Sequence, residues 1–242
     1  MTPKFAPAFE PASEPLPTTG QPVGPRVDDR PAPRPGPVVL QGRYGRVERL
    51  DPARHGAALW QSVRDHDGVW TYMSAYGPFA NEAAFMDWLA SRVPLEDPYS
   101  YVIVEPDGGA VGIATLMEIR PAMRVIEVGH IVYSPALQRT PLGTEAQYLL
   151  ARYAFETLGY RRYEWKCNAL NAPSRRAALR YGFTFEGIAR QHMIAKGRNR
   201  DTAWYSMLDT EWPARRAAFE AWLSPDNFDS EGRQKRSLGA AT

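Results

Sequence analysis

A β-strand pattern that runs directly into an amphipathic helix pattern constrains this chain more than any other feature. Alternating and β-branched residues at 125–133 predict a strand, and a short turn with Ser134 and Pro135 follows. Residues 141–158 then repeat apolar side chains at intervals of three and four, with Gly159 suited to a left-handed C-cap. A strand that feeds a helix through a short turn directs several backbone N–H groups at one point, and that point attracts an anion.

The same alternation between a period of two and a period of three to four residues recurs along the middle of the chain. It predicts a single mixed α/β domain, in which Pro106-Asp107-Gly108-Gly109 closes an antiparallel hairpin. The expected strands are 46–50, 100–105, 110–118, 125–133, 162–167, 183–191 and 202–208. The expected helices are 52–66, 81–92, 141–158, 172–181 and 211–223.

The two ends of the chain differ in composition from its middle. Eleven of the 22 prolines lie between Pro3 and Pro37, among few large apolar residues, so residues 1–43 are expected to form a disordered proline-rich tail. Residues 226–242 are predicted to be a polar C-terminal tail. The folded domain is therefore expected to span residues 44–225.

Charge and cysteine content narrow the possible partners and location. The formal net charge of +2 gives no strong field for nucleic acid, so no nucleic-acid partner is expected. The single cysteine, Cys167, excludes an intrachain disulfide, and four histidines form no cluster at metal-ligand spacing, so no metal is expected. No secretory signal or membrane-spanning stretch is evident, which favours a soluble cytoplasmic protein, monomeric or homodimeric.

Two motifs give the chain a family resemblance. Gln138 opens and Gly143 closes a turn like the CoA-binding turn of the GNAT acetyltransferase superfamily, and Asn171-Ala172-Pro173-Ser174 resembles that family's Asn-x-x-Ser helix start. Pro141 departs from the family pattern because it replaces the middle glycine and has no N–H to offer. The resemblance spans about residues 46–212 and is strongest to the branch that acetylates ribosomal-protein N-termini.

The resemblance implies a fold and a cofactor site. The fold would be a GNAT-like α/β domain with a mixed, mostly antiparallel central sheet, flanked by helices, and a V-shaped splay between its fourth and fifth strands. Acetyl-CoA would be the co-substrate: main-chain amides of the turn would hold its phosphates, and the end of the preceding strand would pair with its pantetheine arm. The cofactor-binding residues implied are Ile131, Val132, Tyr133, Gln138, Arg139, Thr140, Leu142, Gly143, Thr144 and Asn171.

Acetyl transfer needs a neutral amine and a proton source for the departing thiolate. Strict alternation places Glu127 on the strand face shared with residues 129, 131 and 133, with His130 opposite, and Glu127 is the candidate base. Ala178 stands where many relatives have a tyrosine acid, so Ser174 is the candidate acid. The residues also allow simpler roles: a salt-bridged strand carboxylate for Glu127, and an N-cap and a first-turn residue for Asn171 and Ser174.

An N-acetyltransferase that acts on a protein N-terminus or a small amine is therefore the expected function. A non-catalytic CoA-binding module of the same fold is the alternative. An aromatic-rich stretch is either a wall of the acceptor pocket or a hydrophobic core, and it comprises Trp70, Tyr72, Met73, Tyr76, Phe79 and Phe85. Residues 196–200 form a basic turn, either solvated or suited to an acidic acceptor.

Overall fold

The structure is a computed structural model that describes residues 11–240, which fall into two units. The first unit ends at Arg30, and its described part holds a small hairpin of β1 (Glu14–Pro15) and β2 (Pro22–Val23). Every residue from 11 to 30 except Val23 is exposed. The second unit, from Pro31 onward, contains all the elements described below.

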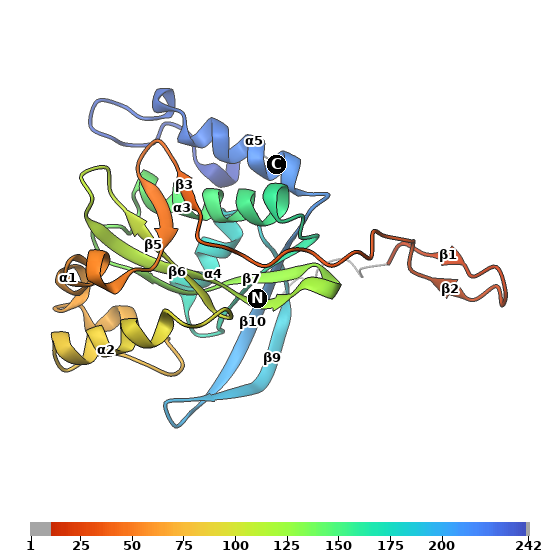
Figure 1. The fold of residues 1–242 in the computed structure, drawn as a ribbon. Helices are drawn as coiled ribbons and strands as arrows, with labels where there is room; N and C mark the ends of the chain where they lie inside the picture. The colour runs from red at the N-terminus through yellow and green to blue at the C-terminus, as the bar shows by residue number, and fades with distance from the viewer. Residues whose placement is uncertain (1–10, 241–242) are drawn as a thin grey trace, which may run out of the picture. The chain divides into compact units, whose positions relative to one another are not determined.

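One eight-stranded sheet forms the centre of the second unit, in the order β3-β4-β5-β6-β7-β8-β10-β9 (Figure 1). All neighbouring strands are antiparallel except β7 and β8, which confirms the expected mixed, mostly antiparallel sheet. The strands are β3 (Val39–Gln41), β4 (Arg46–Arg49), β5 (Tyr99–Val104), β6 (Ala110–Arg120), β7 (Val125–Tyr133), β8 (Arg162–Asn168), β9 (Thr184–Ala195) and β10 (Arg198–Leu208).

Five α-helices flank the sheet, and their ends follow the expected capping chemistry. Asn81 accepts a hydrogen bond from the Ala84 N–H at 2.9 Å, as an N-cap residue does, and Gly159 has the positive φ (69°) expected of a C-terminal glycine. The helix predicted at 141–158 changes at Tyr153 into a five-residue π-helix, Tyr153–Thr157. The α-helices are α1 (Pro52–Val63), α2 (Glu82–Arg92), α3 (Pro141–Arg152), α4 (Ala172–Arg180) and α5 (Trp212–Leu223).

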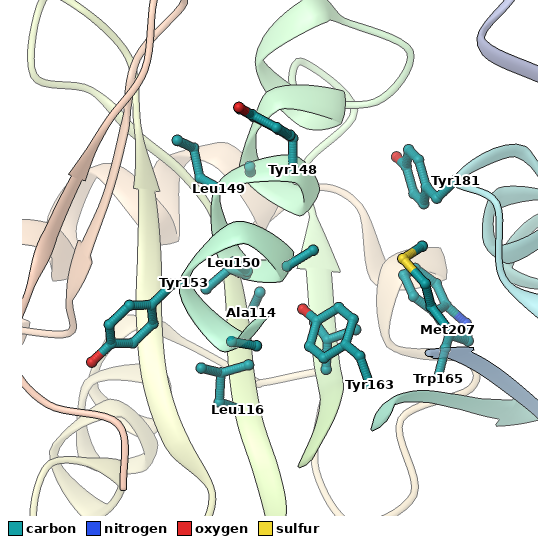
Figure 2. Close-up of a cluster of buried hydrophobic side chains, with 14 of the residues drawn as sticks. Ala114, Leu116, Tyr148, Leu149, Leu150, Tyr153, Tyr163, Trp165, Tyr181 and Met207 are labelled. Atoms are coloured by element: carbon teal, nitrogen blue, oxygen red, sulfur yellow. The ribbon is translucent and has the colours of Figure 1, made fainter. Parts of the chain in front are cut away.

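The sheet buries both of its faces. Along β5, Tyr101 and Ile103 enter one core and Val102 and Val104 enter the other, as alternation requires. The larger core, called the α3 core here, lies under α3, α4 and α5, and Figure 2 shows its α3 and β6 side chains together. The smaller core, called the α1–α2 core, lies against α1 and α2 on the opposite face. Each layer of helices is therefore held by apolar burial against a shared sheet.

Ordered contacts extend into both ranges that the sequence assigns to tails. β3 pairs with β4 at the edge of the sheet, and Ala32 is buried in the α3 core. Near the other end, Leu238 enters the same core, and the Asn227 side-chain amide donates to the Trp222 carbonyl at 3.0 Å. Within residues 11–240, no helix has the length and apolar character needed to span a membrane.

Candidate functional site

The parallel strands β7 and β8 are paired only over their first halves. Residues 125–128 of β7 pair with residues 162–165 of β8. Beyond these residues β7 continues to Tyr133 and β8 to Asn168, and the two strands no longer pair with each other. Counting from β4, these are the fourth and fifth strands, so the expected V-shaped splay is confirmed. The opening lies between the end of β7, which leads into α3, and the end of β8, which leads into α4.

A β-bulge in β7 sets which side chains face each side of the splay. His130 and Ile131 together lie opposite the single residue Ala114 of β6, and His130 has a positive φ of 48°. A bulge leaves backbone groups outside the regular ladder of hydrogen bonds. The strand end that the resemblance assigns to pantetheine therefore has an irregular backbone at this point.

The bulge makes the strict alternation expected for β7 wrong beyond Gly129. Ile131 and Tyr133 pack against the α3 core, whereas Glu127 lies on the opposite face of the sheet. The His130 ring lies on the same side as Glu127, with its centroid 5.5 Å from that of Tyr76. Glu127 and His130 therefore share the α1–α2 face, which reverses the predicted arrangement.

The turn before α3 leaves part of its main chain unpaired. The Gly143 N–H donates to the Thr140 hydroxyl at 3.0 Å, and the Thr144 N–H donates to the Thr140 carbonyl at 3.3 Å. The Thr140 N–H makes only a long contact of 3.4 Å to a carbonyl of the preceding turn. The N–H groups of Arg139 and Leu142 have no hydrogen-bond partner between residues 11 and 240. These two amides, at a helix N-terminus, suit an anionic ligand.

Gly143 has a packing role within the turn before α3. A Cβ there would lie 2.7 Å from the Leu137 carbonyl oxygen and 3.2 Å from the Tyr133 ring. The Tyr133 hydroxyl donates to the Gly143 carbonyl at 2.8 Å and accepts from the Gln147 side-chain amide at 2.8 Å. The glycine is required because it packs inward against the turn.

Gln138 and Arg139 complete the turn. The Gln138 side-chain amide donates to the Tyr133 carbonyl at 3.0 Å, so it closes the turn onto the end of β7. Arg139 has a left-handed backbone, with φ at 64°, which directs the chain into the helix. Its guanidinium makes no hydrogen bond or ion pair with residues 11–240. Gln138 therefore shapes the site through its side chain, and Arg139 shapes it through its main chain.

Arg180, at the end of α4, is a residue that the sequence analysis missed. Its guanidinium donates to the Thr144 hydroxyl at 3.1 Å and lies 4.7 Å from the centre of the Trp222 ring. Burial lowers the pKa of Arg180, and no carboxylate within residues 11–240 forms an ion pair with it. It also lines a cavity of about 140 Å³ with Tyr181 and Arg215. An arginine in a last helical turn is usually a partner of the helix dipole, so no sequence pattern distinguished Arg180 as a site residue.

Asn171 and Ser174 lie together at the start of α4. The Asn171 side chain accepts from the Ser174 N–H at 3.1 Å, which is the N-cap geometry that the sequence allowed. The Ser174 hydroxyl accepts from the Trp165 indole N–H at 3.0 Å and also contacts the Cys167 thiol. Burial raises the pKa of Cys167, as expected for a small buried residue.

Glu127 is paired with Lys166, a second residue that the sequence analysis missed. Their Oε2 and Nζ atoms are 2.9 Å apart, and only 5% of Glu127 is exposed. Burial raises the pKa of Glu127 to about 7, and the nearby Lys166 ammonium is the main opposing influence. Lys166 also lies 3.2 Å from Glu164 and packs over the Trp204 ring. The site therefore contains a carboxyl group that titrates near neutral pH.

The aromatic stretch between α1 and α2 mainly forms core. Trp70 and Phe85 are buried in the α1–α2 core, and Phe79 packs against both rings. Tyr76 is the member that reaches the bulge of β7, through His130. Tyr72 instead donates to the Leu170 carbonyl at 3.2 Å, beside the start of α4. Of the two interpretations left open, core formation fits most of the stretch, and Tyr76 borders the site.

Comparisons with known proteins agree with this geometry. The crystal structure of a GCN5-related N-acetyltransferase from Brucella melitensis is 47% identical, covers 87% of this chain and 96% of its own, and has a TM-score of 0.84. A structure from Chromobacterium violaceum, described as a probable acetyltransferase of the GNAT family, is 42% identical, covers 86% of this chain and 100% of its own, and has a TM-score of 0.74.

One named sequence relative is similar to part of this chain. The Bacillus subtilis (strain 168) protein named "Putative ribosomal N-acetyltransferase YdaF" is 31% identical over 106 residues, which are 44% of this chain. The match spans 57% of that relative's length. The model of the acetyltransferase (GNAT) domain family matches residues 47–184, more than half of the chain and all of the splayed site. The chain belongs to the GNAT acetyltransferase family.

Proposed function

We propose that this chain transfers an acetyl group from acetyl-CoA directly to a primary amine. The observation that carries the proposal is the splay of β7 and β8, which opens beside two unpaired amides at the start of α3. Those amides, from Arg139 and Leu142, offer hydrogen bonds to the diphosphate of CoA. Arg180 supplies a positive charge next to the same helix end, and no carboxylate among residues 11–240 is paired with it.

Acetyl-CoA supplies a thioester whose carbonyl carbon is attacked by the amine. The backbone of β7 from Ile131 to Tyr133 lies along the splay, where its N–H groups can bind the pantetheine arm and the thioester oxygen. Asn171 caps α4 at the other side of the opening. In this proposal the main chain orients the donor, and side chains handle the protons.

Glu127 is proposed as the base that receives a proton from the acceptor ammonium, directly or through a water molecule. A pKa near 7 allows it to be ionised at physiological pH and still hold a proton once it accepts one. Lys166 holds the carboxylate in place at 2.9 Å. The proton lost by the amine thus has a defined destination.

Ser174 is proposed as the proton donor for the departing thiolate. The Trp165 indole donates to the Ser174 oxygen, so the serine hydroxyl keeps its own proton, which it can give to the thiolate in place of its contact with the Cys167 thiol. In the overall reaction a C–N bond forms, the C–S bond breaks, and the sulfur gains a proton. Water reprotonates the serine or replaces it as the donor.

A thiol-release assay with purified protein tests the proposal. Acetyl-CoA would be combined with a panel of peptides with free N-termini, polyamines and small amines, and the products would be weighed by mass spectrometry. We expect thiol release that matches the amount of acetylated amine, with turnover reduced in Glu127→Gln. Saturable CoA binding without thiol release from any amine would favour the non-catalytic binding module instead. A cytoplasmic location is part of the same proposal.

A further inference from the structure

Arg200 occupies a position on the same side of the sheet as Glu127. In β10, Ala203 and Tyr205 enter the α3 core, so Trp204 faces the opposite side, and Arg200 contacts Ser74 of the loop between α1 and α2 on that side. Trp204 pairs in register with Lys166 of β8, and β8 ends before it reaches Arg200. The arginine therefore extends past the end of β8, at the edge of the splay.

The hydrogen-bonding capacity of Arg200 is largely unused. Its Nη1 atom donates to the Ser74 hydroxyl, but its Nε–H is buried and has no partner within the described part of the chain. No carboxylate of residues 11–240 forms an ion pair with it. The Nε–H therefore lacks an acceptor, and the side of a guanidinium that carries Nε–H and an Nη2–H matches the two oxygens of a carboxylate.

The other charges on this face do not neutralise Arg200. Glu127 is held by Lys166 at 2.9 Å, so the nearest acid already has a cation. His130 is uncharged at neutral pH because burial, with Arg92 and Arg200 nearby, lowers its pKa to about 4. A ligand with a negative charge would therefore enter a region with an excess of hydrogen-bond donors.

The region around Arg200 is enclosed by the loop between α1 and α2. Lys196, at the tip of the β9–β10 hairpin, donates to the Trp70 carbonyl at 3.0 Å and to the Gly77 carbonyl at 2.6 Å. Ser74, the partner of Arg200, belongs to the same loop. The β9–β10 hairpin and the loop between α1 and α2 are therefore joined beside Arg200. A charge-assisted hydrogen bond between Arg200 and a ligand would be stronger there than in open water.

We propose that the acceptor is an amine that also carries a carboxylate, and that Arg200 binds this carboxylate while Glu127 faces the amine. This rests on the proposed acetyl transfer, and it names the class of acceptor. A free amino acid and a peptide with an acidic residue beside its N-terminus share this chemistry. Arg200 is then the residue that sets acceptor specificity.

Calorimetry in the presence of saturating CoA tests acceptor binding without relying on turnover. Alanine would be compared with alaninamide, and the peptide amide Ala-Asp-Ala with Ala-Asn-Ala. We expect the carboxylate member of at least one pair to bind about 10- to 100-fold more tightly than its neutral partner. The pair that shows the difference identifies the source of the carboxylate.

Three variants assign the preference to Arg200. Arg200→Gln should reduce the difference within the pair to less than about twofold, and Arg200→Lys should restore part of it. Arg198→Gln is the matched control, because Arg198 is an exposed cation two residues away on the same strand, and it should keep the full preference. Acetyl-CoA affinity should not change in any of the three.

Two results separate this inference from the proposed function. Equal affinities of the wild-type chain for both members of each pair, or no binding of either, would overturn the carboxylate inference even if neutral amines are acetylated. A preference that disappears in Arg200→Gln supports it even if no thiol is released. The absence of thiol release would contradict only the proposed acetyl transfer.

Discussion

Replacing Lys166 by methionine should move the ionisation of Glu127 to higher pH. Burial raises the pKa of Glu127 to about 7 even with the Lys166 ammonium 2.9 Å away. An opposite charge at such a distance usually lowers a carboxyl pKa by about 1 to 3 pH units, so its loss should raise this pKa to about 8 to 10. Methionine has a side chain of similar length but lacks the ammonium, so the contact of Lys166 Nζ with the Trp204 ring, 4.0 Å from its centre, is lost together with the charge.

The sign of the kinetic effect follows from the role of the base. Protonated Glu127 cannot accept a proton, so the rate falls as pH drops below its pKa. In the wild-type chain, kcat/KM for the acceptor should fall below about pH 7, and in Lys166→Met the fall should begin about 1 to 3 pH units higher. Glu127→Gln should lose this dependence, apart from the ionisation of the acceptor itself, which is common to all variants.

The assay is the pH dependence of kcat/KM for one acceptor at saturating acetyl-CoA. Arg198→Gln serves as the control for removal of a positive charge, because Arg198 is exposed and lies six residues along β10 from Trp204, the residue that pairs with Lys166. An acidic limb at the same pH in the wild type and in Lys166→Met would refute the assignment of Glu127 as the base.

Stability provides an independent check on the same pKa. A raised carboxyl pKa stabilises the folded state below about pH 4.5, and this contribution is lost as pH rises through about 7. The change from 4.5 to about 7 corresponds to about 3 kcal/mol. The stability of the wild type relative to Glu127→Gln should therefore fall by about that amount between pH 4 and pH 8, as measured by urea unfolding. A stability difference between the wild type and Glu127→Gln that stays constant from pH 4 to pH 8 would contradict the raised pKa of Glu127.

Three further substitutions probe the donor site. Gly143→Ala should lower the unfolding free energy by about 1–3 kcal/mol, since its Cβ would lie 2.7 Å from a carbonyl oxygen; an unchanged melting temperature would contradict this packing. Arg180→Gln should weaken acetyl-CoA binding about tenfold in calorimetry, while Arg176→Gln, an exposed control on the same helix, should not. Ser174→Ala should lower kcat more than the KM for acetyl-CoA and cost about 1 kcal/mol of stability, because the Trp165 N–H loses its acceptor; an unchanged kcat would leave water as the proton donor.

Local sequence patterns predicted the elements of the fold well, because short-range physics decides them. The strand at 125–133 agrees with the structure to the residue, and the helix predicted at 81–92 is observed at Glu82–Arg92. The β9–β10 hairpin was predicted too short, since its exposed strands do not alternate between apolar and polar residues. The helix predicted up to residue 158 carries a π-helical turn that apolar spacing does not reveal.

The details of the site were less accessible from sequence because distant contacts decide them. The bulge at His130 depends on a positive φ in a residue that is not glycine, so no pattern marked the point where the alternation changes. Lys166 belongs to the site because it pairs with Glu127 on another strand, and Arg180 because it donates to Thr144 on another helix. Gly143 was recognised as necessary, but its reason is the Leu137 carbonyl behind it.

The most direct test of the account follows the backbone amides of the turn before α3 by ¹⁵N-resolved NMR during a titration with CoA. We expect the Arg139 and Leu142 amide resonances to move most, because those N–H groups have no partner in the described part of the free chain. The Gly143 amide, already bonded to Thr140, should move less. Saturation with CoA that leaves the Arg139 and Leu142 resonances in place would show that these amides do not bind the diphosphate of CoA.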